Sequence, residues 1–278
     1  MSYLKDVYTL KNGVTIPKIG FGTWQVPNGD VAYQAVKEAI EAGYIHIDTA
    51  YDYRNEVSVG QAVKDSGIPR DQLFITSKLP SHIKTFEETE TYFNETVANL
   101  GFDYLDLFLI HAPWPWSNIG QDCREGNALA WQKMIELYEA KKIRAIGVSN
   151  FNVDDLKDLI ERTGVVPHVN QIAFFAGQFP KQKETIEFCQ RHNILVEAYS
   201  PLAIGHALDH PVILEMAKRY DKTPAQILIR YTLSKNTLPL PKTTKKYRML
   251  ENAAVDFVLN IEDVTILDAL DADPRRWS

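Results

Sequence analysis

Four polar residues in the first half of the chain have the types that a proton-transfer site needs. Each stands at or just after the end of a short apolar stretch: Asp48 and Tyr53 after one, Lys78 at the next, and His111 after the third. A free tyrosine has a pKa of about 10, too high for acid–base work at neutral pH, and a nearby ammonium lowers it. We therefore predict that Lys78, held in place by Asp48, tunes Tyr53. His111 would orient a carbonyl oxygen beside the phenol.

Each of these residues also has an ordinary structural interpretation when it is taken alone. An aspartate at a strand end often caps a helix, a lysine is usually solvated, and a histidine often makes structural hydrogen bonds. Tyr53 is one of 13 tyrosines. The catalytic hypothesis therefore requires a fold that brings three consecutive strand ends together.

Short apolar strands alternate with amphipathic helices along most of the chain. Several helices are expected to end at a glycine, as at Gly43, Gly101 and Gly164. The predicted helices cover 30–42, 55–66, 89–100, 127–141, 154–162, 181–191, 211–220 and 224–234. The predicted strands cover 18–21, 44–48, 73–78, 104–111, 143–148, 168–173, 194–199 and 238–242. Several are apolar without alternation, as expected for strands that crossover helices bury on both faces.

Eight strands, most of them separated by a helix, in about 250 residues predict an α/β fold of the (β/α)8 (TIM) barrel type. A β-hairpin at residues 7–17, turning at Asn12-Gly13, is expected to precede the barrel. No linker or low-complexity tract divides the chain, so we expect a single domain over residues 1–278. A doubly wound parallel sheet is the alternative. In a barrel, chemistry occurs at the carboxyl ends of the strands, where the four polar residues stand.

The composition excludes several classes of protein. The 278 residues are 45% hydrophobic, which supports a large core and excludes a disordered chain or a coiled coil. The chain has 30 basic and 36 acidic residues, a net charge of −6 and no basic cluster, so we expect no nucleic-acid partner. No apolar run is long enough to span a membrane, and the first residues carry no apolar signal segment. With two cysteines in no CxxC motif, we expect a cytoplasmic protein.

The motifs around these residues resemble those of the aldo-keto reductase family over nearly the whole chain. Residues 43–56 (GYIHIDTAYDYRNE) are similar to its first signature, with the aspartate and the tyrosine five apart. The bacterial branch of 2,5-diketo-D-gluconate and glyoxal reductases is the most similar part of the family. The other similar motifs are 76–79 (TSKL), 109–111 (LIH), 141–151 (KKIRAIGVSNF), and 241–244 (PKTT) with Arg248, Glu251 and Asn252.

This resemblance implies an NADPH-dependent oxidoreductase that acts on CH–OH donors and, in reverse, reduces aldehydes, ketones or keto-sugars by hydride transfer. By the same resemblance Tyr53 is the general acid in reduction. Lys78, paired with Asp48, tunes that acid, and His111 positions the substrate carbonyl. The cofactor carries the hydride chemistry, while the protein fixes geometry and electrostatics.

The cofactor site is partly visible in the residues themselves. Hydroxyl and amide groups at Ser149, Asn150 and Gln171 suit a carboxamide. Lys242 and Arg248, six residues apart around the start of a helix, could both reach a 2′-phosphate, which favours NADPH over NADH. By the resemblance, the aromatic ring of Tyr199 stacks on the nicotinamide. The cofactor residues expected here are Thr23, Asp48, Ser149, Asn150, Gln171, Tyr199, Ser200, Pro201, Leu202, Lys242, Thr243, Thr244, Arg248, Glu251 and Asn252.

The substrate pocket departs from the family pattern at two positions. Ala112 follows the motif histidine, where tryptophan is common in the family, and Ala203 stands where glycine is common. The loop around Ala203 and the C-terminal tail are both short, so we expect an open, permissive pocket. Aromatic and catalytic side chains should contact the substrate. The expected contacts are Trp24, Tyr53, His111 and Trp114, with Trp277 as a further candidate.

Two other functions remain open at this stage. A catalytically silent NADPH-binding barrel protein would retain the same motifs, as some members of the family do. A barrel hydrolase would need paired carboxylates or metal ligands at the strand ends, whereas Asp48 is accompanied there by Lys78. His206 and His210 lie four apart without further ligands, so no metal is expected. We expect a monomer whose partner is a small carbonyl compound, with no membrane partner.

Overall fold

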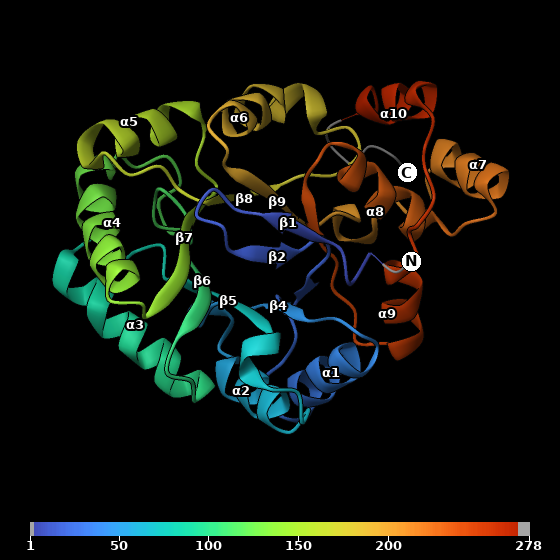
Figure 1. Ribbon diagram of the computed structural model, residues 1–278. Helices are drawn as coiled ribbons and strands as arrows, with labels where there is room; N and C mark the ends of the chain where they lie inside the picture. Colours follow the sequence, from blue (N-terminus) through green and yellow to red (C-terminus); the bar gives the residue numbers. More distant parts are fainter. Residues whose placement is uncertain (1–2, 272–278) are drawn as a thin grey trace.

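Eight parallel strands form a ring at the centre of the molecule, and helices surround it (Figure 1). The computed structural model describes residues 3–271. Neighbouring strands pair in chain order, which confirms the predicted (β/α)8 fold. The strands are β3 (Phe21–Gly22), β4 (His46–Asp48), β5 (Phe74–Leu79), β6 (Leu105–Ile110), β7 (Ile143–Ser149), β8 (Val169–Ala173), β9 (Leu195–Tyr199) and β10 (Leu238–Leu240).

Backbone hydrogen bonds between the first and the last strand segments close the ring. The N–H of Gly20 donates to the carbonyl of Pro239 at 3.1 Å, and the N–H of Gly22 donates to the carbonyl of Pro241 at 3.0 Å. The two prolines have no N–H of their own, but their carbonyls suffice for this pairing. A Cβ at Gly20 would lie 2.6 Å from Nδ1 of His46, so the close approach requires a glycine.

Helices cover the outside of the ring (Figure 1). Several begin at side-chain caps, such as Asn152 and Thr223, whose oxygens accept hydrogen bonds from the first turn. No helix among residues 3–271 is long and apolar enough to cross a membrane. The helices are α1 (Asp30–Glu41), α2 (Glu56–Lys64), α3 (Phe86–Leu100), α4 (Arg124–Glu139), α5 (Val153–Thr163), α6 (Phe179–Arg191), α7 (Pro211–Tyr220), α8 (Pro224–Ser234), α9 (Lys246–Ala253) and α10 (Ile261–Asp268).

The eight expected helices are present, with ends shifted by a few residues. The structure adds α10 and defines α9, of which the sequence analysis gave only a start between Lys242 and Arg248. Asn260 caps α10 by accepting a hydrogen bond from the N–H of Asp263. Its buried residues are few, and Ile261 and Ile266 on its surface are exposed. Because its apolar residues do not form one stripe, the sequence pattern did not distinguish this helix from a loop.

A two-stranded hairpin closes one end of the barrel (Figure 1). Strands β1 (Val7–Thr9) and β2 (Thr15–Pro17) pair antiparallel, as the Asn12-Gly13 turn predicts. Leu10 of the hairpin packs in one apolar cluster with Phe74 and Leu238, the first residues of β5 and β10. The hairpin therefore covers the amino-terminal ends of the strands and leaves the carboxyl-terminal end for chemistry.

The inward-facing residues change from apolar to polar along the barrel axis. Near the hairpin, Leu107 and Val169 belong to the apolar cluster. Toward the other end, the corresponding positions carry Asp48, Lys78 and Gln171, all of them buried. A polar layer inside a barrel is costly unless its members bond to one another, so this layer is the place to look for function.

Candidate active site

Lys78 lies at the centre of the polar layer. Strand β5 holds its side chain completely out of solvent. Its Nζ donates to Oδ1 of Asp48 at 2.7 Å, to the carbonyl oxygen of Thr49 at 2.8 Å and to the phenolic oxygen of Tyr53 at 3.3 Å. An ammonium has three N–H donors, so all of them are used. The structure thus brings together three of the four residues predicted to catalyse.

A short 3-10 turn, η1 (Tyr51–Tyr53), presents Tyr53 to Lys78. Asn55 fixes the position of this turn. Its Nδ2 donates to the carbonyl of Thr23 at 3.0 Å, and its Oδ1 accepts from the hydroxyl of Thr49 at 2.8 Å. The hydroxyl of Thr23 in turn donates to the carbonyl of Asp48 at 3.0 Å. The phenol is therefore placed by a network of buried groups.

Burial and charge act in opposite directions on Tyr53. Burial raises the pKa of Tyr53, and the ammonium of Lys78 offsets part of that rise. Burial also opposes the charge of Lys78, but Asp48 and Tyr53 outweigh it and raise the pKa of this lysine. Lys78 acts on the phenol in the expected direction, but desolvation is the larger effect. The phenol consequently keeps its proton at neutral pH, as a proton donor must.

His111, the fourth predicted catalytic residue, follows β6 directly. Its ring makes edge-to-face contacts with Tyr53 and Trp116, each at 5.7 Å between ring centroids. Its Nδ1 lies 3.2 Å from Oδ2 of Asp52. Its carbonyl oxygen accepts a hydrogen bond from Nδ2 of Asn150 at 3.0 Å. Burial lowers the pKa of His111, although Asp52 acts to raise it.

A second group of buried polar residues lies beneath Asp48. Nε2 of Gln171 donates to Oδ2 of Asp48 at 2.9 Å and to Oε2 of Glu197 at 2.7 Å. Burial, and then the charge of Asp48, raise the pKa of Glu197 to about 8. Burial lowers the pKa of His46, whose Nε2 lies 3.9 Å from Oε1 of Glu197, to about 4. Both Glu197 and His46 are therefore uncharged at neutral pH.

The residues expected to hold a carboxamide lie side by side at the ends of β7, β8 and β9. The hydroxyl of Ser149 donates to the carbonyl of Gln171 at 2.9 Å and accepts from Nδ2 of Asn150 at 3.0 Å. The hydroxyl of Tyr199 donates to Oδ1 of Asn150 at 2.8 Å. Because Nε2 of Gln171 points inward to two carboxyl groups, its Oε1 remains as an acceptor. The donors of Ser149, Asn150 and Gln171 are engaged within the protein, so the set offers acceptor oxygens to the N–H groups of a primary amide.

The residues expected to hold a phosphate lie at the start of α9. Lys242 and Arg248 are exposed, as is Thr244, while Thr243 is buried and its hydroxyl accepts from the N–H of Lys245. The helix has no side-chain cap and no acidic residue in its first turn. Free N–H groups, the helix dipole and two cations all favour an anion, so this segment fits a 2′-phosphate.

The remaining cofactor candidates are spread over two places. Residues 200–202 form the turn after β9, where Ser200 has a φ of 52°. Oε1 of Glu251 accepts a hydrogen bond from the hydroxyl of Thr223, the cap of α8, at 2.9 Å. Asn252 beside it is buried. The carboxylate of Glu251 is thus already engaged within the protein.

The aromatic wall beside His111 contains a tryptophan that was not expected there. Trp116 contacts the imidazole, whereas the expected Trp114 stacks edge-to-face on Trp116 at 4.9 Å. Ala112 is completely buried. Trp277 lies outside the described residues.

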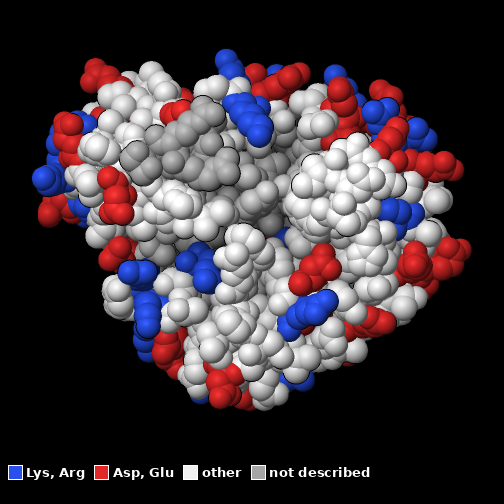
Figure 2. Space-filling view, turned by 180° about the vertical axis from the view of Figure 1, so that it is seen from behind, with Lys and Arg blue, Asp and Glu red and all other residues white. Residues whose placement is uncertain are grey.

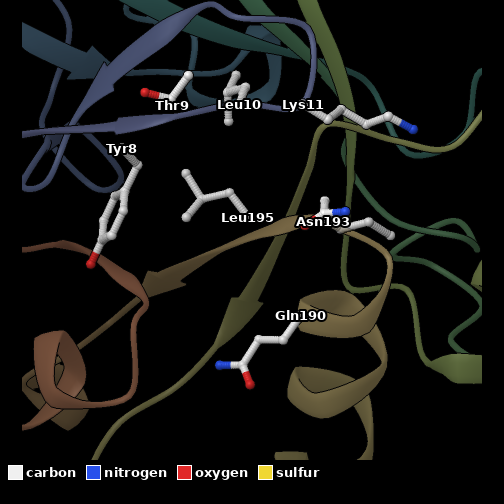
Figure 3. Close-up of a pocket in the computed structure, with 8 residues that line it drawn as sticks. Tyr8, Thr9, Leu10, Lys11, Gln190, Asn193 and Leu195 are labelled. Carbon is white, nitrogen blue, oxygen red and sulfur yellow. The ribbon is translucent and has the colours of Figure 1, made fainter.

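A depression lies at one end of the barrel and a separate cavity at the other. Figure 2 shows the end opposite the hairpin, which is hollowed near its centre. Trp24, in the loop after β3, is 44% exposed. At the hairpin end an open cavity of about 380 Å³ contains none of the predicted site residues (Figure 3). It is lined by Tyr8, Thr9, Leu10, Lys11, Gln190, Asn193, Ile194 and Leu195.

Three residues of this site were not identified from the sequence. Glu197 stands two positions before Tyr199, so strand alternation alone could have placed it on the same inward face. Asp52 directly precedes Tyr53, but its contact depends on the shape of η1. Trp116 lies in a proline-flanked loop whose path no local pattern defines.

The chain is similar to known proteins over nearly its whole length. The model of the aldo/keto reductase family matches residues 18–272. A glyoxal reductase of Bacillus subtilis is 41% identical over 98% of this chain and 95% of its own. A glycerol 2-dehydrogenase (NADP(+)) of Saccharomyces cerevisiae is 39% identical over 92% of this chain and 88% of its own. A solved aldo/keto reductase of Brucella melitensis superimposes with a TM-score of 0.88 at 39% identity, covering 96% of this chain and 99% of the other. A solved aldo-keto reductase of Bombyx mori in complex with NADP superimposes with a TM-score of 0.85 at 32% identity. The match covers 96% of this chain and 93% of the other.

Proposed function

The chain belongs to the aldo/keto reductase family, and on that premise we propose that it reduces aldehyde and ketone carbonyls with NADPH, with Tyr53 as proton donor. The observation that supports this role is the position of the Lys78 ammonium. It lies 3.3 Å from the phenolic oxygen of Tyr53 and 2.7 Å from Asp48, without access to solvent.

Tyr53 gives its proton to the carbonyl oxygen as negative charge develops there. The phenolate that remains faces Lys78, whose positive charge stabilises it. Asp48 keeps Lys78 in position and favours its charged form. A positioned acid of this kind contributes about 10²–10⁴-fold to the rate.

His111 orients the carbonyl oxygen toward the phenol. Tyr53 and Trp116 hold its ring from two sides.

NADPH, when bound, supplies the hydride that the carbonyl carbon accepts. Ser149, Asn150 and Gln171 would hold the carboxamide of the nicotinamide, and Tyr199 would cover one face of its ring. For the 2′-phosphate, the uncapped start of α9 with Lys242 and Arg248 offers N–H groups and positive charge. These two cations are the reason to expect a preference for NADPH over NADH.

Small carbonyl compounds are the substrates that we propose. Relatives at about 40% identity are named glyoxal reductase and glycerol 2-dehydrogenase, and the exposed Trp24 at the open end of the barrel suits a permissive pocket. We further propose a cytoplasmic monomer. Cys123 and Cys189 are both free thiols, which agrees with a reducing compartment.

The test is a comparison of turnover with binding. Loss of reduced nicotinamide absorbance would be followed with NADPH and with NADH against a panel of aldehydes and α-dicarbonyls, and cofactor affinity would be measured by quenching of protein fluorescence. Turnover that prefers NADPH supports the proposal. Tight NADPH binding without turnover of any carbonyl would indicate the catalytically silent binding protein instead.

A further inference from the structure

Asp52 places a carboxylate against the imidazole that faces the substrate. Its Oδ2 lies 3.2 Å from Nδ1 of His111. The His111 side chain is 8% exposed and that of Asp52 is 31% exposed, so the contact lies at the edge of the site. Among the described residues, Nδ1 has no hydrogen-bond partner of good geometry. The carboxylate is therefore the polar group that this buried nitrogen faces.

The charges around the pair keep Asp52 ionised. Burial opposes its charge, but His111, His82 and the backbone N–H of Ser81 outweigh burial and lower the pKa of Asp52. On the other side of the ring, Lys78 opposes and Asp48 favours a positive charge on His111. The phenol of Tyr53 is uncharged because burial raises its pKa. The dominant fixed charge at Nδ1 is consequently negative.

A negative charge at Nδ1 decides which nitrogen carries the proton. A neutral imidazole has one N–H donor and one acceptor nitrogen, and only the imidazolium has two donors. An ionised carboxylate only accepts hydrogen bonds, and its negative charge at 3.2 Å favours the tautomer of His111 that carries the proton on Nδ1 over the one that carries it on Nε2. In the neutral ring Nε2 is then a lone-pair acceptor, which repels a carbonyl oxygen.

We propose that Asp52 is a positioning residue that fixes the proton of His111 on Nδ1, so that Nε2 donates to a carbonyl oxygen only from the imidazolium. The first half of this statement concerns the protein alone, and the second half rests on the proposed function. Asp52 therefore gives the reduction an additional dependence on pH. As pH rises above the pKa of His111, the donor at Nε2 is lost.

Asp52→Asn removes this constraint with little change in size. The amide can donate its own N–H to an unprotonated Nδ1, which leaves the proton of the neutral ring on Nε2, where it can bond to the carbonyl. We expect kcat/KM of the wild type, divided by that of Asp52→Asn, to fall at least about tenfold between pH 6 and pH 8. Glu95→Gln is the control, because Glu95 accepts from Tyr51 in the same region and does not contact His111.

The tautomer itself is measured by nitrogen NMR of protein labelled at histidine and saturated with NADP⁺. The signals of His111 are identified by their loss in His111→Gln. Above its pKa, we expect the wild type to carry the proton on Nδ1 and Asp52→Asn to shift it toward Nε2. A wild-type ring protonated on Nε2, or a wild-type to variant ratio that stays constant with pH, would overturn the proposal. If no carbonyl is turned over but the proton is on Nδ1, the assignment to Asp52 stands and the proposed function fails.

Discussion

Nζ of Lys78 lies 2.7 Å from Oδ1 of Asp48 inside the barrel, where both groups are buried. Removing one charge of such a buried pair leaves the other without compensation, which costs far more than the loss of a surface pair. The pair therefore serves stability and catalysis together. The same ammonium donates a hydrogen bond to the phenolic oxygen of Tyr53.

We expect Asp48→Asn to lower the free energy of unfolding by about 3 kcal/mol, because the buried ammonium of Lys78 loses its counter-charge. Urea denaturation at pH 7 measures this change. The control is Asp6→Asn, since Asp6 meets Lys18 at 3.8 Å in a largely exposed pair and should change stability by less than about 1 kcal/mol. Equal effects of the two substitutions would contradict the role given to the buried pair.

Protonation of the buried Glu197 should make the stability of the protein depend on pH. Its pKa is raised to about 8 from 4.5, so between these values the folded protein holds a proton that the unfolded chain has released. Stability contributed by protonated Glu197 is therefore complete at low pH and is lost as pH rises toward and through 8. Glu197→Gln lacks this titration.

Denaturation of the two proteins at pH 5 and pH 8.5 measures the difference. We expect the stability of Glu197→Gln relative to the wild type to increase between these values by at least about 1 kcal/mol. A relative stability that does not change with pH would show that Glu197 is ionised in the folded protein. Glu184→Gln, an exposed position on α6, controls for the general effect of charge removal.

Arg248 is expected to discriminate between NADPH and NADH in binding. We expect Arg248→Ala to weaken NADPH binding about 10- to 100-fold and to leave NADH binding nearly unchanged, because only NADPH carries the 2′-phosphate. Fluorescence titration with each cofactor measures both constants. Arg162→Ala, on the surface of α5, should alter neither, since its guanidinium pairs with Asp158. Equal weakening of both cofactors would place the phosphate elsewhere.

The sequence carried most of the information about the fold because burial on both faces leaves a distinctive pattern. The apolar residues of β6 (Leu105–Ile110) are all buried, and the predicted strand over 104–111 contains them. The sequence predicted that the strands close into a ring, but not the contacts that close it. That Gly20 must be a glycine depends on the distance to His46, which no periodicity contains.

The candidate site was predictable where neighbouring strands place inward-facing side chains within reach of one another. Asp48 is in register with Thr76, and Lys78 stands two residues further along β5 on the same face. The side chains of Asp48 and Lys78 therefore meet once the barrel forms. The contact between Asp52 and His111 was not predictable in this way. It depends on a single 3-10 turn and a loop, whose backbone angles are set by tertiary contacts.

The most direct test of the account compares two tyrosines of one turn. Tyr53→Phe and Tyr51→Phe each remove one hydroxyl from η1, but only Tyr53 faces Lys78, while Tyr51 bonds to Glu95 at the surface. We expect Tyr53→Phe to lower kcat for carbonyl reduction by at least about 10²-fold with NADPH binding retained, and Tyr51→Phe to stay within about twofold of the wild type. Full activity in Tyr53→Phe would contradict the mechanism.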